Sequence, residues 1–301
     1  MEYKILILII NTILCVSLLF TQSCNDGDFY EEQQGKSILV VDGWIENNQN
    51  PRVILTYSTP YFSIVDSNSF MTIVEYSFKV SVNDGEHSEV LTFGPDTNYF
   101  PPYIYRGYEI FGEPGKTYQL VVSKSKYIAA KDTFVNDTLI TSTTTIPKPP
   151  EIDTAWFELE PDKDSLGTIK IVFTDDINVH NYYRILTLSK NSYKRYIPVL
   201  SSTIDDDLFK KATITYTLFK GRAAPIMEPE DVFYKIGDVV KIKFCTISKK
   251  SYIFWNTFQL ESLNAINPFA SSNANLQGNI EGEGLGIWSG QGVVYYTLEI
   301  K

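Results

Sequence analysis

Histidine and cysteine are scarce in this chain of 301 residues. It has two histidines, His87 and His180, and three cysteines, Cys15, Cys24 and Cys245. A zinc site with several histidines, or a Ser-His-Asp triad, needs a histidine with a placed partner. The chain also lacks a nucleophile elbow, an H-E-x-x-H pair and a glycine-rich loop that would cradle phosphate. We therefore expect no catalytic residues of these kinds and no cofactor, and we interpret both histidines as exposed loop residues.

Basic residues are outnumbered by acidic ones. The 26 Lys and Arg residues stand against 36 Asp and Glu residues, which gives a formal net charge of −10. An acidic surface repels the phosphates of nucleic acid, and no basic cluster offsets this repulsion. Nucleic acid is therefore excluded as an expected partner.

The N-terminus carries a short apolar run. It extends without charge from Ile5 to Phe20, directly after Lys4. A helix needs about twenty apolar residues to span a bilayer comfortably, so this run is short for an anchor helix, which is the alternative. A lysine followed by an apolar stretch and small residues is typical of a secretory signal peptide, which we assign to residues 1–23.

The residues around Cys24 indicate a lipid anchor. The sequence FTQS before it resembles the bacterial lipobox, although Phe20 stands where leucine is usual. This resemblance implies that Cys24 is acylated, for instance with palmitate, and two or more acyl chains hold a protein stably on a membrane. Residues 24–36 are polar and acidic, which predicts a tether. The acidic cluster after the cysteine resembles the signal that sends Bacteroidota lipoproteins to the cell surface.

The mature chain then keeps Cys245 as its one unmodified cysteine. Cys15 leaves with the signal peptide, so no intramolecular disulfide is expected. Cys245 lies in the strand-like run VVKIKFCTI. A buried, inert thiol is the better interpretation than a nucleophile.

Composition and periodicity predict a mainly β protein of two domains. Aromatic residues make up 14% of the chain, with 20 Tyr and 18 Phe, and such residues favour strands. The proline-rich segment TIPKPPEID reads as a stiff connector between residues 37–147 and 148–301. We predict an immunoglobulin-like or transthyretin-like β-sandwich in the first part, with a two-residue turn at Asp84-Gly85. We predict a second β-rich, sandwich-like domain with one short helix, at residues 249–266, in the other. Alternation predicts core-facing residues in the last strand, namely Val294, Tyr296, Leu298 and Ile300.

Several segments together resemble a known family. They are LVVDGWI, VSVNDGE, GEPGKTYQLVVS, IPKPPEID, DDINVHNYYR, YKIGDVVKIKF with SYIFWNTF, and NIEGEGLGIWSG. In this order they resemble the Bacteroidota lipoprotein family known as domain of unknown function 4249, over nearly the whole mature chain. The resemblance implies an outer-membrane lipoprotein, a carboxypeptidase-regulatory-like β-sandwich followed by a second β-rich domain, and an accessory role beside TonB-dependent receptors. It implies no catalytic residues.

Aromatic residues supply the candidate contact surface. The segment NYFPPYIYRGY holds more rings than a core easily buries, and we name five of them as candidate ligand or partner contacts: Tyr99, Phe100, Tyr103, Tyr105 and Tyr108. Trp288 stands among glycines in the last segment, and two interpretations remain open. Exposed, it would stack on a sugar or a partner; buried, it would fill the core beside a bulged strand, which we prefer.

Acidic loops supply the remaining candidates. Two runs, TDDIN and IDDDL, offer oxygen ligands suited to calcium, although neither has EF-hand spacing. The same carboxylates could act in pairs, as in glycosidases, but the sequence does not pair them. Solvated loops are the preferred interpretation of these residues: Asp175, Asp176, Asp205, Asp206 and Asp207.

The function expected from these observations is non-enzymatic. We expect a surface-exposed outer-membrane lipoprotein that assists a TonB-dependent nutrient uptake system by capturing a ligand, such as a glycan or peptide, or by covering the pore. One alternative is a surface glycan or peptide hydrolase with paired carboxylates. Another is a cell-envelope adhesin or structural lipoprotein.

Overall fold

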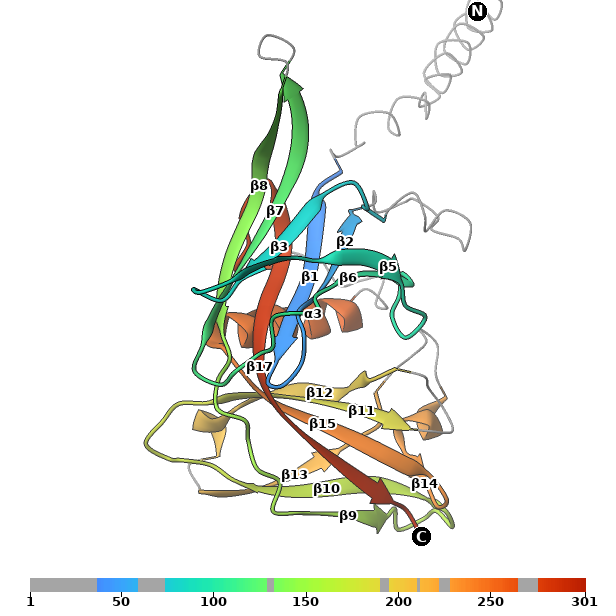
Figure 1. The fold of residues 1–301 in the computed structure, drawn as a ribbon. Coiled ribbons are helices and arrows are strands. Elements are labelled where there is room, and N and C mark those ends of the chain that lie inside the picture. The colour runs from blue at the N-terminus through green and yellow to red at the C-terminus, as the bar shows by residue number, and fades with distance from the viewer. Residues whose placement is uncertain are drawn as a thin grey trace, which may run out of the picture. The chain divides into compact units, whose positions relative to one another are not determined.

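The computed structural model describes residues 37–58, 74–128, 133–189, 195–209, 212–221, 228–264 and 276–301 (Figure 1). The expected signal peptide, Cys24 and the acidic tether lie outside these residues. Within the part described, no helix is both long and apolar enough to cross a membrane. The secondary structure is mostly β, as predicted, and the strands form three sheets.

The largest sheet has eight strands drawn from both halves of the chain. In spatial order they are β12 (Ile197–Asp205), β11 (Tyr182–Ser189), β15 (Val239–Ile247), β17 (Gly284–Glu299), β1 (Leu39–Glu46), β2 (Arg52–Tyr57), β6 (Tyr103–Arg106) and β5 (Thr92–Pro95).

Two smaller sheets complete the fold. The five-stranded sheet contains β16 (Glu281–Gly282), β8 (Thr133–Thr145), β7 (Thr117–Ile128), β3 (Lys79–Asn83) and β4 (Ser88–Val90). In the four-stranded sheet, β10 (Leu166–Thr174) pairs with β9 (Thr154–Leu159), β13 (Thr213–Leu218) and β14 (Tyr234–Lys235). The helices are α3 (Lys249–Asn264) and the short 3-10 turns η2 (Asp206–Leu208) and η3 (Pro229–Val232).

The last strand joins the two halves. β17 pairs in parallel with β1, from Leu39↔Gly284 to Glu46↔Gln291, and its remainder pairs antiparallel with β15. The predicted connector lies between β8 and β9 and therefore separates the two smaller sheets. The large sheet, however, crosses this boundary, because β17 is shared.

One face of the large sheet packs against both smaller sheets. Side chains alternate along a strand, and β1 and β2 send Val41, Ile45, Val53 and Leu55 into a core shared with β3, β7 and β8. The other half of the same face forms a second core over β10 and β13. The predicted core residues of the last strand belong to this second core, with Ile300 buried and the others half-buried: Val294, Tyr296 and Leu298.

The opposite face of the large sheet is covered by α3. The helix packs against β11, β12 and β17. Ser251 at its start contacts Ser289 of β17 (Oγ to Oγ, 3.0 Å), and Gln259 accepts hydrogen bonds from the N–H and hydroxyl of Ser202 (3.0 and 2.8 Å). These polar contacts fix the position of the helix on the sheet.

The predicted helix is confirmed as α3. Ser248 caps it, because its Oγ accepts a hydrogen bond from the N–H of Ser251 (3.2 Å). The last two residues of the prediction, 265 and 266, lie outside the described residues.

The predicted two-residue turn at Asp84-Gly85 is wrong: Asn83 pairs with Ser88, so a four-residue loop joins β3 to β4. The Asp84 carboxylate favours this loop by accepting the N–H of His87 (2.7 Å).

Trp288 is the largest fully buried side chain, in agreement with the preferred interpretation. Its indole N–H donates to the carbonyl oxygen of Tyr118 on β7 (3.0 Å), so it links two sheets. Gly43 makes room for it, and Gly286 lets its strand approach β1 closely. A Cβ at Gly43 would lie 2.9 Å from the Trp288 ring, and Gly286, at φ +120°, lies so close to β1 that a Cβ would meet the Val41 oxygen at 1.9 Å.

Replacing Trp288 with alanine should lower the free energy of unfolding by about 3–5 kcal/mol, because it opens a cavity in the first core. Trp156→Ala is the matched control, since this side chain is 40% exposed; it should cost about 1 kcal/mol or less. Urea unfolding of both variants measures the difference. Equal destabilisation by the two substitutions would contradict the central position of Trp288.

Candidate functional site

A cavity of about 600 Å³ lies between α3 and the face of the eight-stranded sheet that this helix covers. We call it the sheet cavity. Its floor comes from β1, β2, β11, β15 and β17, and its walls come from β12, α3 and the loop at residues 98–100. Five lining residues are also solvent-exposed and mark where it opens: Asn98, Phe100, Arg195, Phe258 and Tyr295.

Strand alternation explains why charged residues line the cavity floor. In β1, Val41 and Ile45 face the core, so Asp42, Trp44 and Glu46 must face the other side. The register then places neighbouring strands side by side on that face: Ile54 lies opposite Asp42, and the strand order continues through β17, β15 and β11. In β11 and β15 the same alternation sends further side chains to the cavity: Arg184, Leu186 and Lys243.

A buried ion pair crosses the cavity floor. Lys243 Nζ of β15 lies 2.7 Å from Glu46 Oε1 of β1, and the Tyr295 hydroxyl donates to Glu46 Oε2 (2.6 Å). Burial alone would raise the pKa of Glu46, but Lys243 and Tyr295 lower it below its ordinary value. Burial would likewise lower the pKa of Lys243, yet Glu46 raises it. Both groups are therefore charged at neutral pH.

Arg184 carries a second buried charge. Its guanidinium lies over the Trp255 ring of α3, 3.6 Å from the ring centroid, in a cation–π arrangement. Burial lowers the pKa of Arg184 to about 10, although the nearby Asp42 acts in the opposite direction. Burial raises the pKa of Asp42, which Arg184 and Lys243 only partly offset. The Arg184 charge is therefore less fully compensated than that of Lys243.

Several polar atoms at the cavity have no partner. Among the described residues, five buried side-chain N or O atoms lack a hydrogen bond, and three of them belong to cavity residues: Arg52 Nε, Arg184 Nε and Trp255 Nε1. All three are N–H donors. A buried donor without an acceptor is costly and rare in folded proteins. These three donors make the cavity a candidate binding site.

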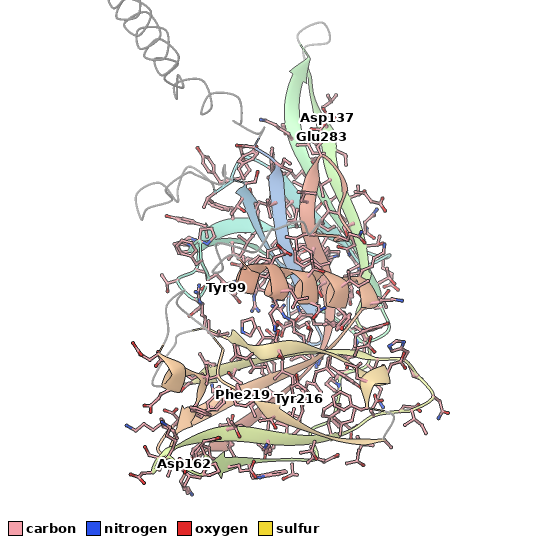
Figure 2. The ribbon with its side chains drawn as sticks, turned by 180° about the vertical axis from the view of Figure 1, so that it is seen from behind. Tyr99, Asp137, Asp162, Tyr216, Phe219 and Glu283 are labelled. Carbon is pink, nitrogen blue, oxygen red and sulfur yellow. The ribbon has the colours of Figure 1, made fainter. Side chains whose placement is uncertain are left out.

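The aromatic segment predicted as a contact surface reaches the cavity at one end. Tyr99 and Phe100 line it, and Tyr99 packs on Trp44 with ring centroids 5.3 Å apart. Figure 2 shows Tyr99 beside α3. An ion pair between Arg106 and Asp96 holds the segment against the sheet.

The other predicted aromatic contacts do not line the cavity. Tyr103 is half-buried and stacks on Phe93, and Tyr108 is exposed. Tyr105 and Trp288 are buried in the first core, so neither is accessible to a partner. The reason for Tyr105 is its inward register, which also lets its hydroxyl donate to the Glu75 carbonyl oxygen (3.1 Å).

The second of the two acidic runs lies around His180. Its Nε2 lies 2.7 Å from Asp205 and 3.6 Å from Asp206, and its Nδ1 lies 3.4 Å from Asp207. Asp206 also accepts the N–H of Asn181 (2.5 Å). His180 is thus an exposed loop residue, as predicted, but one with carboxylate partners.

Asp175 and Asp206 are brought together by Asn181, which the sequence did not reveal. The side-chain amide of Asn181 donates to Asp175 (3.1 Å), and its backbone N–H donates to Asp206 (2.5 Å). Burial, followed by the charge of Asp175, raises the pKa of Asp206. Asp175 also accepts hydrogen bonds from Tyr183 and Asn181. These hydrogen bonds tie the two acidic loops together.

The predicted calcium ligands form only part of a metal site. His180, Asp205 and Asp206 offer ligand atoms within 4.8 Å of one another. Calcium takes about six to eight oxygen ligands, and an imidazole in the set suits a transition metal better. Asp176 is not part of the group, because it caps its own turn through the N–H of Asn178 (3.0 Å).

Cys245 is a buried free thiol next to the cavity floor. Its Sγ lies 3.8 Å from Gln291 Oε1, and burial raises the pKa of the thiol to about 11. The thiol is therefore protonated at neutral pH, and a protonated thiol is a poor nucleophile.

Most residues of the sheet cavity were missed by reasoning from sequence. The available signal was a charged residue within or at the end of an otherwise apolar strand, as in LVVDGWIE, YYRILTLS and VVKIKFCTI. The residues that this signal marks are Asp42, Glu46, Arg184 and Lys243. Their convergence required the pairing of β1 with β17, which no local pattern announces.

Comparison with known proteins gives one family. The family model described as a domain of unknown function (DUF4249) matches residues 27–296. No curated protein is significantly similar to the chain in sequence.

Lys243→Met should lower the free energy of unfolding at pH 7 by about 3–5 kcal/mol, because it leaves Glu46 buried without its counterion. The pKa of Glu46 is then no longer lowered by Lys243, and burial raises it. In the native protein, the contribution of ionised Glu46 to the free energy of unfolding is lost as pH falls below the ordinary glutamate pKa. In the variant, protonation of Glu46 at low pH removes the cost of burying its unpaired charge. The difference in free energy of unfolding between the native protein and the variant, measured with urea, should therefore decrease from pH 7 to pH 4. Lys241→Met, an exposed lysine of the same strand, is the control; a difference that is constant with pH would contradict the pairing.

His180 should titrate above its ordinary pKa of about 6.5, chiefly because of its hydrogen bond to Asp205. A raised histidine pKa favours the folded state below the ordinary pKa, and this contribution disappears as pH rises through the folded-state pKa. Proton NMR resolves two histidine ring signals, and Asp205→Asn should lower the titration midpoint of one while leaving the other in place. A variant in which neither midpoint moves would contradict the contact.

Proposed function

The chain belongs to the DUF4249 family, and on that premise we propose that it is a surface-exposed outer-membrane lipoprotein that binds a small ligand for a TonB-dependent uptake system. Its role is non-enzymatic. The ligand occupies the sheet cavity, and the lipid on Cys24 keeps the protein beside the transporter.

The unpaired donors of the sheet cavity carry this proposal. A cavity of about 600 Å³ falls in the range of small-molecule sites, which are mostly apolar with a few convergent polar groups. Arg184 and Trp255 come from different elements and meet at the cavity with N–H groups that no described residue satisfies. A polar pocket kept at such cost is better explained by a bound ligand than by packing.

The N-terminal sequence supports the location. The lipobox-like FTQS before Cys24 favours acylation, and two or more acyl chains hold a protein on a membrane. About twelve polar residues follow, enough to reach up to roughly 40 Å from the bilayer when extended. A ligand-binding body on such a tether could reach a neighbouring transporter.

The alternative of a carboxylate hydrolase gains little from the geometry. Asp175 accepts hydrogen bonds from Tyr183 and Asn181, and Asp206 accepts one from Asn181. Both carboxylates are thus held by donors of the protein itself. We therefore propose no catalytic residues. An adhesin has no specific observation in its favour.

The proposal predicts that the lipidated protein co-purifies with a β-barrel transporter in near-equal amounts from its native outer membrane in mild detergent. Cys24→Ala should abolish co-purification, because the unanchored chain no longer stays at the membrane. Mass spectrometry of the pull-down identifies the partner.

Cys245→Ala is the matched control, since this buried thiol takes no part in anchoring. It should retain the partner. A lipidated protein recovered without any transporter would contradict the uptake role.

A further inference from the structure

The sheet cavity has more positive than negative lining. Three cations face it from strands, and two anions accompany them: Arg52, Arg184, Lys243, Asp42 and Glu46. Arg195 adds a further cation at the mouth. The whole chain carries a net charge of −10, so this local excess runs against the average of the surface. A local excess of one sign favours a ligand of the other sign.

The unsatisfied buried polar atoms of the cavity residues are all donors. Lys243 is satisfied by Glu46, but Arg52 Nε, Arg184 Nε and Trp255 Nε1 have no acceptor. A ligand donor cannot pair with any of them, since arginine and indole nitrogens only donate. The atoms that complete this site are therefore acceptors, and two guanidinium groups favour a planar oxyanion.

Arg184 is the central member of this set. Its side chain is only 8% exposed, and α3 fixes it from the opposite side through the Trp255 ring at 3.6 Å. Stacking holds the guanidinium plane without using its N–H groups, and no described residue accepts a hydrogen bond from its Nε. Its nearest opposite charge, Asp42, offsets the burial of Arg184 only in part.

Apart from Asn98 and Gln291, the rest of the lining is mostly aromatic and aliphatic. Trp44, Tyr99 and Tyr196 provide rings, and Ile54 with Leu186 provides aliphatic surface. Such walls bury a hydrophobic body rather than a sugar with many hydroxyl groups, whose polar atoms would need partners. The site thus combines an oxyanion end with an apolar chamber.

We propose, on the basis of the proposed function, that the ligand of the sheet cavity is a small organic carboxylate with an aromatic or other apolar body, whose carboxylate binds Arg184 and Arg52 beside Trp255. This chemistry belongs both to free aromatic acids and to the C-terminus of a short peptide.

Isothermal titration calorimetry of the full chain in a neutral detergent tests this ligand class. Indole-3-propionate should bind, its amide should bind about 10- to 100-fold more weakly, and tryptamine should bind no better than the amide, since a hydrogen bond to a charged group contributes about 1.5–3 kcal/mol. N-acetyl-tryptophan and its amide form a second pair. Tighter binding of the N-acetyl acid than of indole-3-propionate identifies a peptide terminus, and the reverse order identifies a free acid.

Variants locate the binding. Arg184→Gln should weaken indole-3-propionate about 10- to 100-fold, while Lys241→Gln, which removes a charge from the exposed part of β15, should leave it within twofold. Trp255→Phe keeps the ring and removes one donor, so it should weaken binding several-fold even if Arg184→Gln fails to fold. Circular dichroism checks that each variant is folded.

The possible failures are distinguishable. Equal binding of acid and amide, or tighter binding of tryptamine, would overturn the carboxylate assignment and leave the uptake role standing. Binding of the acid that all three substitutions leave unchanged would overturn the sheet cavity as its site. Absence of binding by every probe at millimolar concentration would overturn the ligand class, while the pull-down of the transporter tests the uptake role separately.

Discussion

The parallel pairing of β1 with β17 is the constraint on which the rest of the structure depends. It joins residues near the start of the described chain to residues near its end, and it places two otherwise separate sets of strands in one eight-stranded sheet. Trp288, carried by β17, enters the core that β1 forms with the five-stranded sheet. Small residues at Gly43 and Gly286 are needed for this approach, because a Cβ at either position would collide with its neighbour. One strand pair therefore determines both cores.

The same pairing determines which side chains lie on the face of the large sheet that α3 covers. Alternation gives each central strand one apolar side for the cores and one side for α3 and the sheet cavity. Glu46 of β1 and Lys243 of β15 meet only because β17 lies between their strands. Burying this pair is expensive, and well-packed apolar residues often stabilise a protein as much or more. The proposed binding of a polar ligand group accounts for charges that are retained at such a place, next to unsatisfied donors.

Much of the fold follows from local pattern, and little of the site does. The alternation in β3 and β17, the proline connector and the spacing of apolar residues in α3 each reflect contacts within a few residues or with a neighbouring strand. They predicted a mainly β chain with one helix. Arg184 and Asp42 come together from positions 142 residues apart in the sequence, and no periodicity encodes such a pairing. The aromatic segment was a partial guide. It brought Tyr99 and Phe100 to the cavity but also contained Tyr105, which the core takes up. The three carboxylates around His180 illustrate the same limit, because their contact with the histidine depends on loops whose meeting is set by β11 and β12.

The central claim is that a ligand binds in the sheet cavity, and the four tryptophans allow a direct measurement. Trp44 and Trp255 line the cavity, Trp288 lies in the first core, and Trp156 is on β9 of the four-stranded sheet. Fluorine NMR of 5-fluorotryptophan-labelled protein, titrated with indole-3-propionate and assigned by single Trp→Phe variants, reports on all four positions at once. The account predicts that the Trp44 and Trp255 signals shift together while those of Trp156 and Trp288 stay in place. Shifts confined to Trp156 or Trp288, or no shift at any position at millimolar ligand, would contradict it.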